Sequence, residues 1–358
     1  MRAVVLVGGE GTRLRPLTLT TPKQMLPVAE VTMIERVLSH LASHGIDEAI
    51  LSLGYRPDAF RVAFPDGACA GVKLGYAVEP EPLDTAGGIA FAARAAGIDE
   101  QFLVVNGDVL ADLDLSGLVE FHRSHGGEAT IALTPVTDPT GFGVVPTDEG
   151  GRVIAFLEKP PPSQAPTNNI NAGFYVLEAS VLDRVGEGAR MNIEREVFPS
   201  LVDDQAVYGL AFDGYWADTG TPDRYLQANL DCVRGTRGGL PAPGAKERDP
   251  GVWTLGAGVI DGEVVGPTLL GDAAFVGRNA VVQGSVVGGG ARVESGATVV
   301  GALLLPGAVV RQGARVEGSI VGEGAVVGED AQVEGLTVVQ GGAEVAAGSV
   351  VRGARVAA

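Results

Sequence analysis

The sequence predicts an α/β domain with a mainly parallel sheet, followed by a β-helix. Residues 1 to about 235 alternate short β-branched runs with longer amphipathic ones, which is typical of βα units. Residues 235–250 (GTRGGLPAPGAKERDP) are rich in Gly, Pro and charge and lack periodic apolar positions, as in a linker. Beyond Val252, apolar residues recur every six positions between small residues, as stacked β-helix coils require. We therefore expect a first domain over 1–235, a linker over 236–250 and a β-helix over 251–358.

Apolar periodicity locates the elements of the first domain. Runs rich in β-branched residues predict strands over Ala3–Val7, Glu48–Leu53, Lys73–Ala77, Phe102–Asn106, Thr130–Pro135 and Gly173–Leu177. Apolar positions near a 3.6-residue period predict helices over Thr32–His44, Gly87–Ala95 and Ser116–His125.

The β-helix prediction depends on aliphatic residues spaced six apart. They are Val276 and Val282, then Val293, Val299 and Leu305, then Val310 and Val316, then Val321, Val327, Val333, Val339, Val345 and Val351. Breaks in this phase near 288, 306 and 317 indicate turns or register slips. A disordered Gly-rich tail is the alternative, and the regular aliphatic spacing argues against it.

Composition narrows the class of ligand. The net charge of −18 over 358 residues opposes binding to nucleic acid or to an anionic membrane, because both need clustered Lys and Arg. No apolar run approaches the ~18 residues of a membrane span, and no signal peptide precedes the first apolar run, so we expect a cytoplasmic protein. Cys69 and Cys232 form no metal-binding spacing. A small anionic substrate remains possible and would need local cations.

A glycine-rich loop follows the first predicted strand. It reads Val7-Gly8-Gly9-Glu10-Gly11-Thr12-Arg13-Leu14, with Lys23 nearby. Glycines let backbone N–H groups approach phosphate oxygens, and Arg and Lys neutralise them. The loop lacks the GxxxxGK[ST] and GxGxxG patterns. We expect Val7, Gly8, Gly9, Gly11 and Thr12 to contact a nucleotide, with Arg13 and Lys23 on its phosphates.

The segment GGEGTRLRPLTLTTPKQMLP resembles the signature of the nucleotidyl transferase family, which makes nucleoside diphosphate sugars. The resemblance covers essentially residues 1–235, and the tail is similar to the left-handed β-helix of many members. It implies a Rossmann-like catalytic domain in which a sugar-1-phosphate attacks the α-phosphorus of a nucleoside triphosphate and pyrophosphate leaves. Arg13, Lys23, Asp108 and Lys159 are then the expected catalytic residues.

Two carboxylates are candidates for a metal site. Asp108 follows the apolar strand 102–106 and so lies at the carboxyl edge of the sheet, where open α/β folds bind ligands. In isolation it could equally be a helix cap. The resemblance assigns Asp108, together with Asp218 in the segment WADTGTP, to Mg²⁺, a cation that prefers carboxylates and phosphate oxygens.

The resemblance also assigns the sugar-phosphate site. Lys159 in Glu158-Lys159-Pro160 is expected to hold the sugar phosphate, and Glu158 to accept hydrogen bonds from sugar hydroxyls. Asn171 in Asn171-Ala172-Gly173 is similar to the family's sugar-contacting segment, and Gly143 offers a backbone N–H.

Residues 79–86 are expected to contact the base. Glu79 stands where relatives that use uridine or thymidine nucleotides carry Gln, and a carboxylate can accept from both the N1–H and N2–H₂ donors of guanine. Asp84 occupies a position that is usually Gly in the family, and Thr85 and Ala86 follow it. We therefore favour GTP.

The N-terminal spacing and the segment 193–199 (IEREVFP) resemble the mannose-1-phosphate guanylyltransferase branch of the family most. This implies GTP and mannose-1-phosphate as substrates and GDP-mannose as product. A glucose-1-phosphate thymidylyl- or uridylyltransferase is the nearest alternative, and a non-catalytic sugar-nucleotide sensor is another. The flat faces of the β-helix predict a homo-oligomer.

Overall fold

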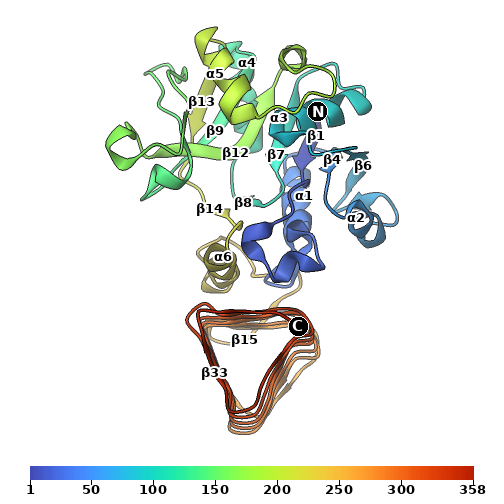
Figure 1. Ribbon diagram of the computed structural model, residues 1–358, viewed down its shortest axis with the longest axis vertical. Helices are drawn as coiled ribbons and strands as arrows, with labels where there is room; N and C mark the ends of the chain where they lie inside the picture. Colours follow the sequence, from blue (N-terminus) through green and yellow to red (C-terminus); the bar gives the residue numbers. More distant parts are fainter. The chain divides into compact units, whose positions relative to one another are not determined.

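The computed structural model describes residues 1–358, which divide into two units (Figure 1). Unit 1 contains Met1–Glu10 and Ile34–Trp216, and unit 2 contains Gly11–Met33 and Ala217–Ala358. The segment Gly11–Met33 therefore belongs to the same unit as the C-terminal part of the chain. Apolar periodicity along the sequence does not predict this grouping, because the two segments are far apart in the chain.

Unit 1 is built on one mixed sheet. Its main path runs through β11 (Leu157–Glu158), β10 (Gly143–Val144), β12 (Asn169–Leu177), β7 (Phe102–Asn106), β1 (Arg2–Leu6), β4 (Glu48–Leu53), β6 (Val72–Val78) and β5 (Ala68–Cys69). A branch adds β9 (Ala129–Pro135) beside β12 and β13 (Val207–Ala211) beside β9. Strands β7, β1, β4 and β6 are parallel, and β12 is antiparallel to β7. The carboxyl ends of the four parallel strands thus meet at one edge.

Helices complete unit 1. They are α1 (Met33–Ser43), whose first residue is in unit 2, α2 (Pro57–Ala63), α3 (Asp84–Ala95), α4 (Leu115–His125) and α5 (Phe198–Asp203). Helix α3 presents alanines to the core formed with Val4, Ile50 and Val104, and such small side chains allow a helix to lie close to a sheet. The short strand β8 (Val109–Ala111) directly follows Asp108. The short strand β14 (Trp216–Asp218) begins at the last residue of unit 1, and its other two residues belong to unit 2.

The predicted strands and helices agree with those observed to within a few residues. The largest differences are at β12, which begins at Asn169 instead of Gly173, and at α3, which begins at Asp84 instead of Gly87. The part of β12 that the prediction omits contains the polar residues Asn169 and Asn171, which precede an irregularity in the strand at Gly173 (φ +80°). Helix α3 begins at the polar residue Asp84, which has a left-handed backbone conformation (φ +60°).

Unit 2 begins with three short 3₁₀ turns, Thr12–Leu14, Leu17–Leu19 and Lys23–Met25, and the hairpin of β2 (Pro27–Val28) and β3 (Val31–Thr32). Helix α6 (Pro222–Arg234) holds this hairpin. Tyr225 Oη donates a hydrogen bond to the carbonyl of Pro27 (2.5 Å), and Asn229 Oδ1 accepts one from the N–H of Ala29 (2.8 Å). The signature segment is thereby fastened to a helix 200 residues away.

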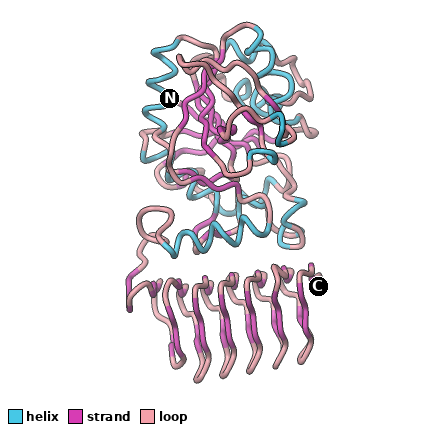
Figure 2. The backbone as a smooth tube through the Cα atoms, turned by 90° about the vertical axis from the view of Figure 1, so that its left-hand side faces the viewer, coloured by secondary structure: helices cyan, strands magenta, loops and turns pink.

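The remainder of unit 2 is a three-sided helix of parallel strands whose coils stack in register (Figures 1 and 2). One sheet contains β15 (Lys246–Asp249), β16 (Val252–Thr254), β19 (Thr268–Leu270), β22 (Val286–Val287), β25 (Leu303–Leu304), β28 (Ile320–Val321), β31 (Val338–Val339) and β34 (Arg355–Val356). The second contains β17 (Val259–Ile260), β20 (Phe275–Val276), β23 (Arg292–Val293), β26 (Val309–Val310), β29 (Val326–Val327) and β32 (Glu344–Val345). The third contains β18 (Glu263–Val265), β21 (Val281–Gln283), β24 (Thr298–Val300), β27 (Arg315–Glu317), β30 (Gln332–Glu334) and β33 (Val350–Arg352). Apart from β15, which is antiparallel to β16, the strands of these stacked sheets are parallel, and they agree with the predicted left-handed β-helix. Strand β15 falls within the stretch that composition marks as a linker.

The coil length explains the phase breaks in the six-residue repeat. Val276 pairs with Val293, and Val293 with Val310, so each of these coils has 17 residues instead of three times six. One side of each coil is therefore a residue short, and the inward residue after Val299 is Leu304, not the predicted Leu305. Fully burying one such Val or Leu stabilises a fold by about 1.5–3 kcal/mol.

None of the helices combines the length and the apolar character that a membrane span requires.

Candidate active site

In unit 1, the loops that follow β1, β7 and β6 contain several of the residues that the sequence predicts to bind the nucleotide and the metal. Val7 and Gly8 follow β1, Asp108 follows β7, and Glu79 follows β6. A Cβ atom on Gly107 would lie 2.7 Å from Val7 Cγ1, so the first two loops are in contact. Parallel strand order, and not proximity in sequence, brings these four residues to one edge of the sheet.

The carboxylate of Glu79 has a fixed orientation. Its Oε1 accepts a hydrogen bond from Ser52 Oγ (2.9 Å), and its Oε2 accepts one from the N–H of Leu83 (3.0 Å). Cβ atoms on Gly8 and Gly88 would lie 3.3 and 2.8 Å from Oε1, so glycines provide the space around this carboxylate. Each oxygen keeps a further lone pair, which leaves Glu79 able to accept from a ligand. Its partner Ser52 stands in no motif that would predict this contact.

The other predicted base contacts begin α3. Asp84 has φ +60°, a conformation that costs glycine little, and this is a physical reason for Gly at this position in relatives. Asp84 Oδ1 accepts hydrogen bonds from Thr85 N–H (2.8 Å) and Asn192 Nδ2 (3.0 Å). Thr85 Oγ1 accepts from Ile193 N–H, and Ala86 N–H donates to the Met191 carbonyl, both at 2.9 Å. The start of α3 is thus bound to residues 191–193.

The predicted sugar-phosphate residues gather at the adjoining part of the sheet. Gly143 of β10 pairs with Glu158 of β11, and Lys159 Nζ lies 3.3 Å from Glu158 Oε1. Lys159 has φ +49° and donates its N–H to the carbonyl of Phe142. The Lys159 side chain is 60% exposed, whereas that of Glu158 is 19% exposed. The cation therefore extends toward solvent over a mostly buried carboxylate.

Asn171 is held beside this pair by a bulge in β12. The register between β12 and β9 shifts between Asn171 and Tyr175, and Gly173 there has φ +80°. A Cβ atom on Gly173 would lie 2.7 Å from Asn106 Nδ2, so this position has no room for a side chain. Asn171 Oδ1 accepts a hydrogen bond from the Gly173 N–H (2.9 Å).

Sequence reasoning missed Glu194 as a site residue. It is the second residue of a short π-helical turn, Ile193–Val197, which is capped by the side chain of Asn192. Asn171 Nδ2 donates a hydrogen bond to Glu194 Oε1 (2.9 Å). Burial raises the pKa of Glu194 from 4.5 to about 6, with a further contribution from the nearby Glu158 carboxylate. The only sequence signal was that residues 193–199 resemble a branch of the family.

The remaining predicted catalytic residues belong to unit 2. Gly11 has φ +62°, and a Cβ atom on it would lie 3.1 Å from Lys23 Cβ, so Lys23 packs on the glycine loop. Thr12 begins the first 3₁₀ turn, which includes Arg13. A Cβ atom on Gly220 would lie 2.7 Å from Arg13 Nη2. The structure thus brings the predicted phosphate-binding cations of unit 2 next to glycines that leave room for them.

Asp218 lies beside Arg13 in the same unit. Its Oδ1 accepts a hydrogen bond from the N–H of Gly220 (2.8 Å), and its Oδ2 forms an ion pair with Arg224 Nη1 (2.8 Å). Both oxygens keep a lone pair that suits a hard cation such as Mg²⁺. The chain has no cluster of three or more His, Cys, Asp or Glu side chains suited to a metal.

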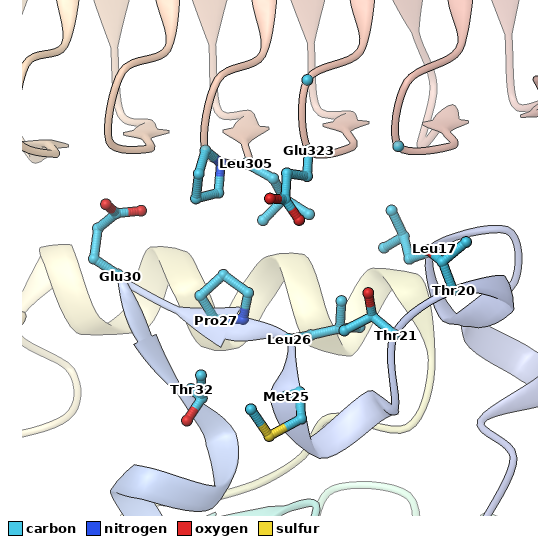
Figure 3. Close-up of a pocket in the computed structure, with 13 residues that line it drawn as sticks. Leu17, Thr20, Thr21, Met25, Leu26, Pro27, Glu30, Thr32, Leu305 and Glu323 are labelled. Carbon is cyan, nitrogen blue, oxygen red and sulfur yellow. The ribbon is translucent and has the colours of Figure 1, made fainter. Parts of the chain in front are cut away.

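A further cavity of about 600 Å³ lies within unit 2, between the segment Leu17–Thr32 and turns of the β-helix (Figure 3). Glu30 and Glu323 are on its walls, and it has no Lys or Arg in its lining. Burial raises the pKa of Glu30, which a hydrogen bond from the Gly289 N–H (2.8 Å) partly offsets. A phosphate-bearing substrate needs cations, so this cavity does not suit one.

Comparison with known proteins identifies the family. The sequence model of the Nucleotidyl transferase family matches residues 2–234, and that of the GMPPB C-terminal domain matches residues 264–358. The chain is 44% identical to mannose-1-phosphate guanylyltransferase of Mycobacterium tuberculosis over 287 residues, which are 79% of this chain and 78% of that one. It is 36% identical to the catalytic subunit beta of the Dictyostelium discoideum mannose-1-phosphate guanylyltransferase, over 75% of this chain and 72% of that one.

Solved structures share the fold. A putative glucose-1-phosphate thymidylyltransferase from Bacillus anthracis has a TM-score of 0.59 at 23% identity and covers 64% of this chain and 94% of its own. HddC from Yersinia pseudotuberculosis has a TM-score of 0.56 at 26% identity and covers 64% of this chain and 97% of its own. The chain therefore belongs to the nucleotidyl transferase family and has that family's GMPPB C-terminal domain.

Proposed function

We propose that this chain forms GDP-mannose and pyrophosphate from GTP and mannose-1-phosphate. The observation that carries the proposal is the 44% identity to a mannose-1-phosphate guanylyltransferase over 79% of the chain. The predicted site residues are of the kinds that this reaction needs, because they include cations suited to phosphates and carboxylates suited to hydroxyls and to a guanine base.

In the proposed reaction, a phosphate oxygen of mannose-1-phosphate attacks the α-phosphorus of GTP. A new P–O bond forms as the bond to pyrophosphate breaks in line. The attacking oxygen is already ionised, so no general base is required. Catalysis depends on positioning the two phosphates and on neutralising their charge.

We assign the three predicted phosphate-binding cations to the two substrates. Arg13 can hold two phosphate oxygens at once, and Lys23 provides a compact charge, so we assign both to the triphosphate of GTP. Lys159 is assigned to the phosphate of the sugar, because its exposed ammonium group extends from the edge of the sheet beside Glu158.

Asp108 and Asp218 would hold Mg²⁺. The cation, when bound to phosphate oxygens, would neutralise the charge that develops on the leaving pyrophosphate. The ion pair with Arg224 and the hydrogen bond from Gly220 would keep the Asp218 carboxylate in one orientation for this ligation.

Glu79 would read the base. A carboxylate fixed by Ser52 and Leu83 retains lone pairs for the adjacent N1–H and N2–H₂ donors of guanine. Uracil and thymine offer one donor between two acceptors, and an unprotonated carboxylate repels the acceptors.

The test is pyrophosphate release with Mg²⁺ for GTP, UTP, dTTP, ATP and CTP, each against mannose-, glucose- and N-acetylglucosamine-1-phosphate. Highest kcat/KM for GTP with mannose-1-phosphate supports the proposal. Highest kcat/KM for UTP or dTTP with glucose-1-phosphate supports the thymidylyl- or uridylyltransferase alternative and removes the assignment of Glu79. Nucleotide binding without turnover for every pair supports a sensor.

A further inference from the structure

Asn171 has few hydrogen-bonding atoms left for a sugar. The two hydrogens of its amide go to Tyr175 Oη (2.8 Å) and Glu194 Oε1 (2.9 Å). Its Oδ1 accepts the N–H of Gly173 (2.9 Å), and the side chain is buried. Since an amide has two donor hydrogens, Asn171 cannot donate to a substrate without breaking one of these bonds.

Glu194, unlike Asn171, has an oxygen atom that can accept a hydrogen bond from a substrate. Its Oε1 is held by Asn171, while its Oε2 accepts no hydrogen bond from any residue of the chain. The carboxylate interacts electrostatically with Glu158, Lys159 and Arg195, and Arg195 Nη2 lies 4.0 Å from Glu158 Oε1. Two carboxylates and two cations therefore form one group at the predicted sugar-phosphate site.

This grouping matches the chemistry of a hexose-1-phosphate. The phosphate needs cations, and a sugar hydroxyl donates most strongly to an ionised carboxylate. The group offers both, because Lys159 and Arg195 are cations and Glu194 keeps a carboxylate oxygen, Oε2, beside the Oε1 that Asn171 holds.

We propose that Glu194 binds a hydroxyl group of the hexose-1-phosphate through Oε2, and that Asn171 is a positioning residue that orients the Glu194 carboxylate. This inference rests on the proposed function and adds to it the residue that recognises the sugar. It changes the role of Asn171, which the sequence assigns to direct contact with the sugar.

The test compares wild type, Glu194→Gln and Glu194→Ala in steady-state kinetics with GTP and mannose-1-phosphate. Glu194→Gln keeps an acceptor for Asn171 and so preserves the local fold. We expect Glu194→Ala to lower kcat/KM for mannose-1-phosphate by about 10- to 100-fold, as loss of a hydrogen bond to a charged group does. We expect Glu194→Gln to lower it less and the KM for GTP to stay within twofold of wild type in both variants.

Deoxy sugars separate recognition from structure. With wild type, the 2-, 3-, 4- and 6-deoxy mannose-1-phosphates should include one that loses about 10- to 100-fold in kcat/KM. In Glu194→Ala the same analogue and mannose-1-phosphate should differ by less than about threefold, because the partner of that hydroxyl is gone. Glu196→Gln is the matched control, since Glu196 is exposed and accepts a hydrogen bond from the Asn192 N–H (2.8 Å).

Unchanged kcat/KM in both Glu194 variants, or an equal loss for all sugars, would overturn the inference. Failure of the proposed function is a distinct result, because wild type itself would then release no pyrophosphate from GTP and mannose-1-phosphate.

Discussion

Replacing Glu194 with Gln should stabilise the protein at neutral pH while weakening its use of sugar. The pKa of Glu194 is raised from 4.5 to about 6 by burial and by Glu158. Because the pKa of Glu194 is higher in the folded protein than in the unfolded chain, the protonated carboxyl stabilises the fold. This contribution is fully present below pH 4.5 and is lost as pH rises through about 6. At 1.36 kcal/mol per pH unit, the ionised carboxylate costs about 2 kcal/mol above this window.

Glutamine has no charge to desolvate and keeps the acceptor that Asn171 uses. We therefore expect Glu194→Gln to raise the free energy of unfolding by about 2 kcal/mol at pH 8 and by less than about 1 kcal/mol at pH 5, because a group with this raised pKa is mostly protonated in the folded protein at pH 5. Urea unfolding of both proteins at the two pH values measures the difference.

Glu196→Gln controls for removal of a charge from the same segment, and its exposed carboxylate should give a smaller pH-dependent change. A Glu194→Gln gain that is equal at pH 5 and pH 8, or no gain at pH 8, refutes the reasoning. The expected result would show a carboxylate retained at the expense of stability, as is common at functional sites.

Three further changes probe the site and its support. Gly173→Ala should lower the free energy of unfolding by about 2–4 kcal/mol, because its φ is +80° and its Cβ would lie 2.7 Å from Asn106 Nδ2. Gly188→Ala, with φ +65° and open space around Cβ, should lower it by less than half as much in the same urea assay. Glu30→Ala should lower the free energy of unfolding by about 1–3 kcal/mol through loss of the hydrogen bond from Gly289 N–H, and Glu30→Gln, which keeps an acceptor, should retain most of it; equal losses would contradict the role of that bond. Lys159→Ala should lower kcat/KM for the sugar-1-phosphate by about 10²–10³-fold with little change in unfolding midpoint, and full activity would remove Lys159 from the phosphate site.

The class of fold and most elements of unit 1 are visible in the sequence because they depend on local apolar periodicity. Strands β4 and β7 have the predicted bounds. The β-helix is visible for the same reason, but its 17-residue coils are not, because a single missing residue per coil looks like a break in phase until the strands are paired. The choice of Leu304 over Leu305 depends on that pairing.

Within the site, the sequence predicts residues that stand in recognisable motifs and misses those that depend on long-range packing. Lys159 and Asp108 stand in the segment EKP and at a strand end, and the resemblance to the family assigns their roles. Glu194 does not, because its place beside Asn171 requires the bulge at Gly173 and the π-helical turn that follows Asn192. Neither feature has an apolar period that a sequence pattern could reveal.

The attachment of the signature segment is a second feature that sequence separation conceals. Residues 11–33, which include Arg13 and Lys23, belong to the same unit as the β-helix. Glu30 reaches the backbone of Gly289, 259 positions away, and a Cβ atom on Gly271 would lie 2.6 Å from its Oε2. Glycines in the first coils of the β-helix thus make room for a carboxylate from the catalytic segment. It follows that the β-helix supports the hairpin that follows Lys23.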